Sequence, residues 1–250
     1  MRKLGLIGYP LSHSFSKKYY LEKFSNEGIK HIDYDLYPIP SINDFKALYI
    51  NTANLYGVNV TIPYKQEVIP LLNELSEEAK EIAAVNCIQI KRIEGQSEPY
   101  LKGFNTDAYG FSESIKPLLK SHHKKALILG NGGATKAVIY SLKQLGIDYQ
   151  IVSRKANGQS LSYDQLNENI IKDHLLIINC SPVGTYPNLD ECPNIPYSGI
   201  SKEHLLYDLI YNPEETKFLT IGKSKGATIK NGYEMLILQA EKNWEIWNQE

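Results

Sequence analysis

The chain has 250 residues and a formal net charge of −1 at pH 7, with 27 basic against 28 acidic side chains. This length suits one large domain or two ordinary ones, and the balanced charge provides no basic field for nucleic acid. The three cysteines lack C-x-x-C spacing and the six histidines form no ligand motif, so we expect neither disulfides nor a metal site. With no signal-peptide pattern and no run of about 18 apolar residues, we expect a cytoplasmic chain that interacts with no membrane.

The first hundred residues predict alternating strands and helices. Residues 4–7 form a short apolar strand, and aromatic pairs four positions apart predict a helix that begins near residue 15 and ends before residue 28. A second strand is expected around residues 34–36. Ser41 followed by Asp44 is the capping-box pattern for the start of the next helix.

A third strand leads to a lysine. Residues 58–62 alternate apolar and polar side chains until Pro63 ends the strand, which predicts that Lys65 lies in the first turn of a helix. Two later segments, residues 84–91 and 100–104, are joined by a polar turn. They predict a β-hairpin.

The second half of the chain has a strand–helix–strand pattern. A helix after Asp107 leads to the polar segment 121–125, a candidate linker. Apolar strands are expected at residues 126–129, 149–152, 175–179 and 205–210, and helices at about 135–145 and 233–247. Such alternation implies an α/β fold with a parallel, doubly wound sheet.

A glycine-rich loop connects the first strand of this half to its helix, and it consists of Gly130, Asn131, Gly132, Gly133 and Ala134. Glycine backbone can approach a pyrophosphate closely, and the helix N-terminus offers N–H groups. Thr135 replaces the third glycine of the usual G-x-G-x-x-G pattern. The loop is therefore either a dinucleotide site or an ordinary tight turn.

The end of the following strand indicates which dinucleotide would bind. Ser153, Arg154 and Lys155 lie where NAD enzymes usually carry an acidic residue for the ribose hydroxyls. A guanidinium suits the 2′-phosphate of NADP, although a surface basic pair is the alternative. We predict NADP.

Lys65 and Asp107 each lie in a polar window at the end of a predicted strand, upstream of the glycine loop. A lysine and a carboxylate that share a proton suggest proton transfer coupled to hydride transfer, which is alcohol/ketone redox chemistry. The alternatives are an exposed structural lysine and an aspartate that caps a helix. Ser14 and Ser16 follow the first strand, and they either contact a ligand or cap the next helix.

Taken together, these windows resemble the shikimate dehydrogenase family from residue 5 to about residue 240. The matching motifs are G-Y-P-L-S-H-S-F-S at 8–16, N-V-T-I-P-Y-K at 59–65, A-V-N at 84–86, G-F-N-T-D at 103–107, G-N-G-G-A at 130–134, N-C-S-P-V-G at 179–184, Y-x-P-x-x-T at 211–216 and G-Y-E-M-L-x-x-Q at 232–239. Ordered motifs across two predicted domains are more specific than any single one.

The resemblance implies a substrate-binding α/β domain at residues 1–107, a Rossmann-type NADP domain at 108–231, and a C-terminal helix at 232–250 that packs back on the first domain. It implies that Ser14 and Ser16 hold the carboxylate of shikimate. The hydroxyls would contact Thr61, Lys65, Asn86, Asp107 and Gln239. Tyr211 would contact the substrate from the cofactor side, and Leu209 and Gly232 would border the nicotinamide.

By the same resemblance, NADPH reduces 3-dehydroshikimate to shikimate in aromatic amino-acid biosynthesis, with Lys65 and Asp107 as the acid–base pair. The sequence departs from the family at two places. Ser153-Arg154-Lys155 occupies the position where Asn-Arg-Thr is common in the family, and the basic residue that usually follows a few positions later is absent. The alternatives are an NAD-dependent enzyme that also accepts quinate, a non-catalytic binding module and, last, a structural protein. The chain could be a monomer or a homodimer.

Overall fold

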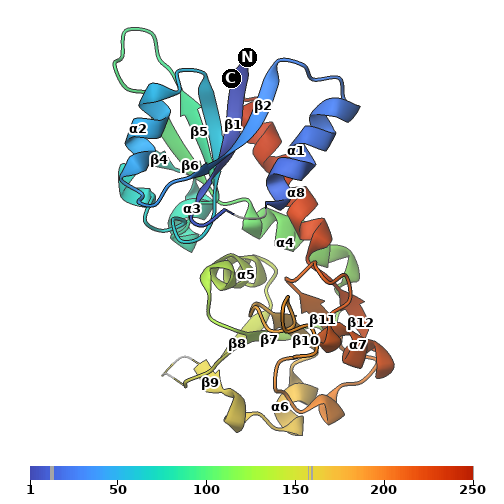
Figure 1. Cartoon of the computed structure of the whole chain (residues 1–250). Helices are drawn as coiled ribbons and strands as arrows, with labels where there is room; N and C mark the ends of the chain where they lie inside the picture. The colour runs from blue at the N-terminus through green and yellow to red at the C-terminus, as the bar shows by residue number, and fades with distance from the viewer. Residues whose placement is uncertain (12–13, 157, 159, 250) are drawn as a thin grey trace. The chain divides into compact units, whose positions relative to one another are not determined.

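The computed structural model describes residues 1–11, 14–156, 158 and 160–249 (Figure 1). Ser12 and His13 of the first polar window, and Asn157 near the basic pair, lie outside the described residues. The chain forms two compact units, Met1–Thr106 with Ala240–Glu250, and Asp107–Gln239. The domain limits drawn from the sequence stay a prediction, because the second limit of the compact units falls inside the last helix.

The first unit contains a six-stranded mixed sheet in the order β2-β1-β3-β5-β6-β4. Its strands are β1 (Arg2–Gly8), β2 (Ile32–Pro38), β3 (Leu55–Val60), β4 (Glu74–Leu75), β5 (Cys87–Lys91) and β6 (Tyr100–Phe104), and its helices are α1 (Phe15–Asn26), α2 (Asp44–Asn51) and α3 (Glu77–Ile82). β1 pairs in parallel with β2 and β3, whereas β5 is antiparallel to β3 and β6. The hairpin predicted from the sequence is confirmed.

Two local predictions in this unit are wrong. Lys65 lies in a run of turns that leads to a short 3₁₀ helix, η1 (Ile69–Leu71), and not in an α-helix. The backbone carbonyl of Lys65 accepts a hydrogen bond from the Val85 N–H at 2.7 Å, so a tertiary partner takes the place of a helical one. Helix α2 begins at Asp44 with Asn43 as its N-cap in place of Ser41, although Ser41 donates its backbone N–H to the Asp44 carboxylate and its hydroxyl accepts from the Asn43 N–H.

The second unit contains a six-stranded sheet in the order β12-β11-β10-β7-β8-β9, with every pair parallel. Its strands are β7 (Lys125–Leu129), β8 (Asp148–Ser153), β9 (Ser160–Ser162), β10 (Leu176–Asn179), β11 (Leu205–Asp208) and β12 (Thr228–Lys230). The chain enters at β7, builds outward to β9 and then returns to β10. This is the Rossmann order, with its switch point between β7 and β10, where ligands bind in such sheets.

Helices cover this second sheet on both faces. They are α4 (Asp107–Ile115), α5 (Gly133–Gln144), α6 (Glu168–Asp173), α7 (Lys217–Ser224) and the first part of α8 (Tyr233–Trp247). Alternate residues of β7 belong to different hydrophobic cores. Ala126 and Ile128 lie in one core, and Leu127 and Leu129 lie in the other. Burial on both faces explains why this strand reads as a continuous apolar run. The predicted doubly wound sheet is confirmed.

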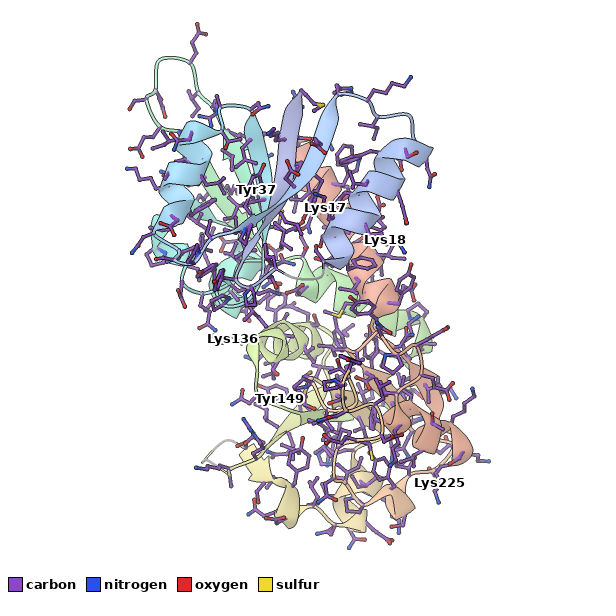
Figure 2. The ribbon with its side chains drawn as sticks, viewed as in Figure 1. Lys17, Lys18, Tyr37, Lys136, Tyr149 and Lys225 are labelled. Atoms are coloured by element: carbon purple, nitrogen blue, oxygen red, sulfur yellow. The ribbon has the colours of Figure 1, made fainter. Side chains whose placement is uncertain are left out.

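The last part of α8 packs within the first unit. The Tyr20 hydroxyl donates to the Ala240 carbonyl at 2.8 Å, and the Trp247 indole donates to the Ile88 carbonyl at 3.0 Å. The outer faces of the helices are charged, as the exposed Lys18 on α1 and Lys225 after α7 illustrate (Figure 2). In the described part of the chain, no helix has the length and apolar character needed to cross a membrane.

Candidate active site

The glycine loop begins at the switch point of the second sheet. Gly130 has φ +112°, a conformation that side chains rarely adopt, and a Cβ there would lie 3.1 Å from the Ser181 nitrogen. Glycine is therefore required by the loop itself. The loop after β7 and the loop after β10 lie against each other at this position, as the switch-point geometry predicts.

Thr135, which replaces the third glycine of the usual pattern, braces this loop. Its hydroxyl accepts from the Gly132 N–H at 3.1 Å and donates to the Gly130 carbonyl at 3.2 Å. The Thr135 side chain is buried. The substitution therefore keeps the loop shape through side-chain hydrogen bonds.

Gly132 and Gly133 differ from Gly130, because a Cβ at either position would meet nothing within 4 Å. Neither has a positive φ, so the fold itself does not demand glycine there. Both lie at the start of α5, where backbone N–H groups and the positive end of the helix dipole favour phosphate. An open, side-chain-free helix N-terminus fits the pyrophosphate of a dinucleotide.

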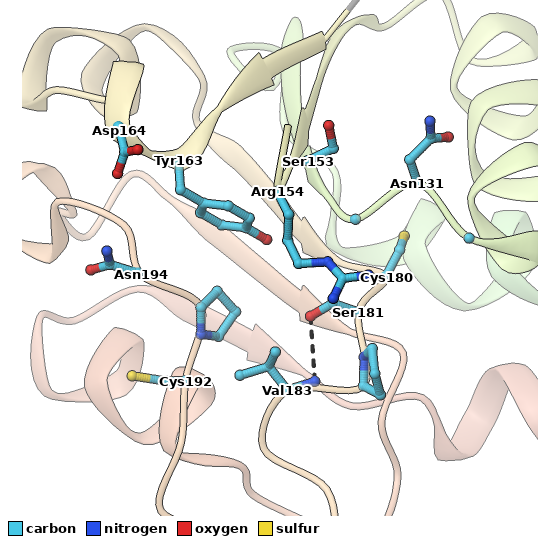
Figure 3. Close-up of a pocket in the computed structure, with 14 residues that line it drawn as sticks. Asn131, Ser153, Arg154, Tyr163, Asp164, Cys180, Ser181, Val183, Cys192 and Asn194 are labelled. Carbon is cyan, nitrogen blue, oxygen red and sulfur yellow. Dashed lines mark hydrogen bonds between the residues drawn. The ribbon is translucent and has the colours of Figure 1, made fainter. Parts of the chain in front are cut away.

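A pocket of about 700 Å³ opens beside this loop, a size suited to a cofactor. It is lined by Gly130, Asn131, Gly132, Ser153, Arg154, Tyr163, Asp164, Cys180, Ser181, Pro182, Val183, Cys192, Pro193 and Asn194 (Figure 3). Five of the predicted cofactor residues therefore share one pocket. The other five, which are Gly133, Ala134, Lys155, Leu209 and Gly232, are not among the lining residues.

Arg154 and Tyr163 both project into this pocket (Figure 3). The Ser153 hydroxyl donates to the Lys155 carbonyl at 2.6 Å, and this hydrogen bond joins the residues on either side of Arg154. A guanidinium and an aromatic ring together suit an adenosine that carries a 2′-phosphate. Tyr163 and Asp164 were not found from the sequence, because β9 and the short helix that follows it (η3, Tyr163–Gln165) carry no periodic pattern.

Leu209 and Gly232, predicted to border the nicotinamide, lie in contact. A Cβ on Gly232 would lie 2.1 Å from the Leu209 carbonyl oxygen, and the Gly232 N–H donates to the Ile210 carbonyl at 3.0 Å. Any side chain at Gly232 would therefore displace the segment after β11. Tyr211, in that segment, is 39% exposed and so accessible to a ligand.

In the first unit, Ser14 and Ser16 lie at the N-terminus of α1. Ser14 is the N-cap, and its hydroxyl accepts from the Lys17 N–H at 3.3 Å. Ser16 lies near Tyr34, whose hydroxyl donates to Asn59 Oδ1 at 2.8 Å and whose pKa is raised well above its usual value by burial. The capping alternative is thus observed for Ser14. It is compatible with carboxylate binding, since a helix N-terminus attracts anions.

Asn86 belongs to a buried polar network. Its Oδ1 accepts from the Thr106 backbone N–H at 2.8 Å and its Nδ2 donates to the Thr106 hydroxyl at 3.0 Å. That hydroxyl in turn donates to Oδ1 of Asn243 on α8 at 2.6 Å, and Asn59 donates to the Asn86 carbonyl. The four side chains are 0–5% exposed. Thr106 and Asn243 were not found from the sequence.

The two predicted acid–base residues belong to different units. Lys65 is half-buried in the first unit, and Asp107 is the first residue of α4 in the second. Their pairing therefore stays a prediction. Thr61 is half-buried before the turn that carries Lys65, and Gln239 on α8 is 8% exposed.

A parallel sheet in Rossmann order, with a phosphate-binding loop and a cofactor-sized pocket at its switch point, defines a dinucleotide-dependent dehydrogenase with an additional α/β unit. Residues 6–88 match the family model described as the shikimate dehydrogenase substrate binding domain. The chain is 40% identical to the NADP(+) shikimate dehydrogenase of Clostridium beijerinckii, covering 100% of this chain and 93% of that protein. The chain belongs to the shikimate dehydrogenase family, and the resemblance seen in the sequence is confirmed.

Solved structures agree over almost the whole chain. Shikimate 5-dehydrogenase from Thermus thermophilus, in complex with NADP(H) and shikimate, has a TM-score of 0.84 at 27% identity, covering 99% of this chain and 94% of that one. The Listeria monocytogenes enzyme, in complex with shikimate and NAD, has a TM-score of 0.84 at 25% identity, with 100% and 92% covered. The predicted two-domain α/β architecture is confirmed.

Proposed function

We propose that this protein catalyses the reversible, NADP-dependent interconversion of 3-dehydroshikimate and shikimate. The observation that carries the proposal is 40% identity along the whole chain to an NADP-dependent shikimate dehydrogenase. The second unit adds independent support for the coenzyme. Arg154 lines its pocket, at the position where an NAD enzyme usually has an acid.

In this proposal the coenzyme is held by the second unit. Gly132, Gly133 and Ala134 at the start of α5 bind the pyrophosphate, and Arg154 pairs with the 2′-phosphate. Leu209 and Gly232 border the nicotinamide ring. When bound, NADPH supplies the hydride that reduces the ketone carbon.

The remaining polar side chains bind the substrate and move the proton. Ser14 and Ser16 hold the carboxylate, and the hydroxyls contact Thr61, Asn86, Tyr211 and Gln239. Lys65 Nζ donates a proton to the oxygen as negative charge develops there, and Asp107 orients that ammonium group. Such general-acid assistance contributes about 10²–10⁴ in rate.

An NAD-dependent reaction is the second candidate, and one observation favours it. Asp164 lines the same pocket as Arg154, and its negative charge would repel a 2′-phosphate.

The test is the initial rate of change in nicotinamide absorbance with shikimate and either NADP⁺ or NAD⁺, with quinate as a second substrate. Turnover mainly with shikimate and NADP⁺ is expected. Equal rates with NAD⁺ would refute the coenzyme assignment.

Protein that binds shikimate but turns over with neither coenzyme would instead be a binding module. We expect the active protein to be cytoplasmic and either a monomer or a homodimer. Cell fractionation and light scattering test these two expectations.

A further inference from the structure

A buried carboxylate that the proposed reaction does not use lies at the end of β11. Asp208 is 0% exposed, and burial raises its pKa from 3.8 to about 6. Its side chain accepts three hydrogen bonds. One donor is the last residue of β10, and the other two come from the segment after β11.

We propose that Asp208 is a positioning residue that joins the loop after β10 to the segment after β11, and so fixes the shape of the coenzyme pocket. The inference rests on the proposed function only in taking this pocket to bind NADP. It concerns a group that contacts neither ligand in the proposal.

The first link runs to the loop after β10. Asn179 Nδ2 donates to Asp208 Oδ1 at 3.0 Å, and Asn179 Oδ1 accepts from the Ser181 N–H at 3.1 Å and hydroxyl at 2.7 Å. The Ser181 hydroxyl accepts in turn from the Val183 N–H at 3.4 Å (Figure 3). Because Ser181 and Val183 line the pocket, the orientation of Asn179 sets one of its walls.

The second link runs to the segment after β11. The Ile210 N–H donates to Asp208 Oδ1 at 3.0 Å, and the Thr216 hydroxyl donates to Oδ2 at 2.6 Å. Thr216 also caps α7, since its hydroxyl accepts from the Leu219 N–H at 3.4 Å. The segment that carries Tyr211 is thus bound to Asp208 near both of its ends.

A carboxylate suits this position because all three neighbours are donors and an ionised carboxylate only accepts. If the Asn179 amide were reversed, its Nδ2 would face the Ser181 N–H and hydroxyl, which both donate to Oδ1 in the observed orientation. A buried charge is costly, and a neutral group would fill the space at lower cost. The arrangement therefore favours accurate placement of the two loops over stability.

The test is NADP⁺ binding by calorimetry at pH 8 for the wild type, Asp208→Ala, Asp208→Asn and Ser141→Ala. Asp208→Ala leaves three donors without their acceptor and should weaken NADP⁺ binding about tenfold or more. Asp208→Asn keeps Oδ1 and should recover most of that loss. The control Ser141→Ala removes hydrogen bonds to the Ala108 and Ala137 carbonyls, away from both loops, and should leave binding unchanged.

The KM for shikimate should also rise in Asp208→Ala, because the segment that carries the proposed substrate contact Tyr211 is held by Asp208 through Ile210 and Thr216. Folded Asp208→Ala that binds NADP⁺ as tightly as the wild type would overturn the inference and leave the proposed function intact. If circular dichroism shows that Asp208→Ala is unfolded, Thr216→Val is the second variant; it breaks the Oδ2 link and the cap of α7 at Leu219 and leaves both bonds to Oδ1 in place. A coenzyme affinity weakened about threefold is then expected, and an unchanged one overturns the inference. A wild type that binds no NADP⁺ would refute the proposed function as well.

Discussion

The coenzyme pocket of the second unit and the polar network around Asn86 in the first unit are built in different ways. The pocket is lined mainly by residues of the loops that follow the strands, with glycines where a phosphate would approach. The network consists of side-chain amides and hydroxyls from β3, the segment before β5, the residue before α4 and α8. One is a local structure, and the other is assembled from distant parts of the chain.

This difference predicts different responses to substitution. A backbone-built site tolerates most side-chain changes but not the loss of particular glycines. A buried side-chain network loses stability and function together when one member is removed, since its partners remain buried without hydrogen bonds. The following four expectations test the contrast, beginning with the largest effect.

Lys65→Ala should lower kcat by about 10²–10⁴ while leaving shikimate binding nearly unchanged, since it removes the proposed proton donor. Stopped-flow rates and equilibrium binding of shikimate measure the two quantities. Lys18→Ala, a change to a lysine whose side chain is 79% exposed on α1, is the control and should behave as the wild type. Undiminished turnover by Lys65→Ala would eliminate the proposed acid.

Asp208 should make the second unit less stable as the pH rises. Its pKa is 3.8 ordinarily and about 6 in the folded protein, so between these values the folded state binds more protons and stability falls with increasing pH. At about 1.4 kcal/mol per pKa unit, the full loss is about 3 kcal/mol, and most of it falls between pH 4 and pH 7. Urea unfolding of the wild type and of Asp208→Asn from pH 4 to pH 7 measures this loss of stability. The difference between the two proteins isolates Asp208, because all other groups titrate in both. Parallel stability curves would contradict the expectation.

Asn243→Leu should damage the network in the first unit. It removes the 2.6 Å bond from the Thr106 hydroxyl to Asn243 Oδ1 and leaves that hydroxyl only its bonds to the Asn86 amide, which costs about 1–3 kcal/mol of unfolding free energy. Because Thr106 holds the Asn86 amide, we also expect the KM for shikimate to rise about tenfold. The Kd for NADP⁺ should not change, and a parallel loss of coenzyme affinity would show that the effect is not confined to the first unit.

Gly132→Ala should have the smallest effect on folding but a distinct effect on coenzyme binding. Its Cβ would enter open space, so the unfolding free energy should change by less than about 1 kcal/mol, while NADP⁺ binding weakens about fivefold. Gly130→Ala is the matched comparison, and its φ of +112° makes it destabilising. Equal thermal stability of the two variants would refute the distinction between them.

The sequence alone determined the backbone-based features of this protein. The four central strands of the second half, helices α5 and α8, the β5–β6 hairpin and the glycine loop before α5 were predicted from local periodicity and turn chemistry, whereas β9, β12, α6 and α7 were not. These features depend on residues that are neighbours in the chain. Family membership followed from the same short motifs, because their order along the chain is itself sequence information.

Only the tertiary structure decided which buried polar groups meet. Asn243 bonds to Thr106 from 137 positions away, and Asp208 joins Asn179 to Thr216 across two strands. The turn at Lys65 likewise follows from a hydrogen bond to Val85, which no local pattern announces. Such pairs form because a buried donor must find an acceptor wherever the fold provides one, and that position depends on the packing of the whole unit.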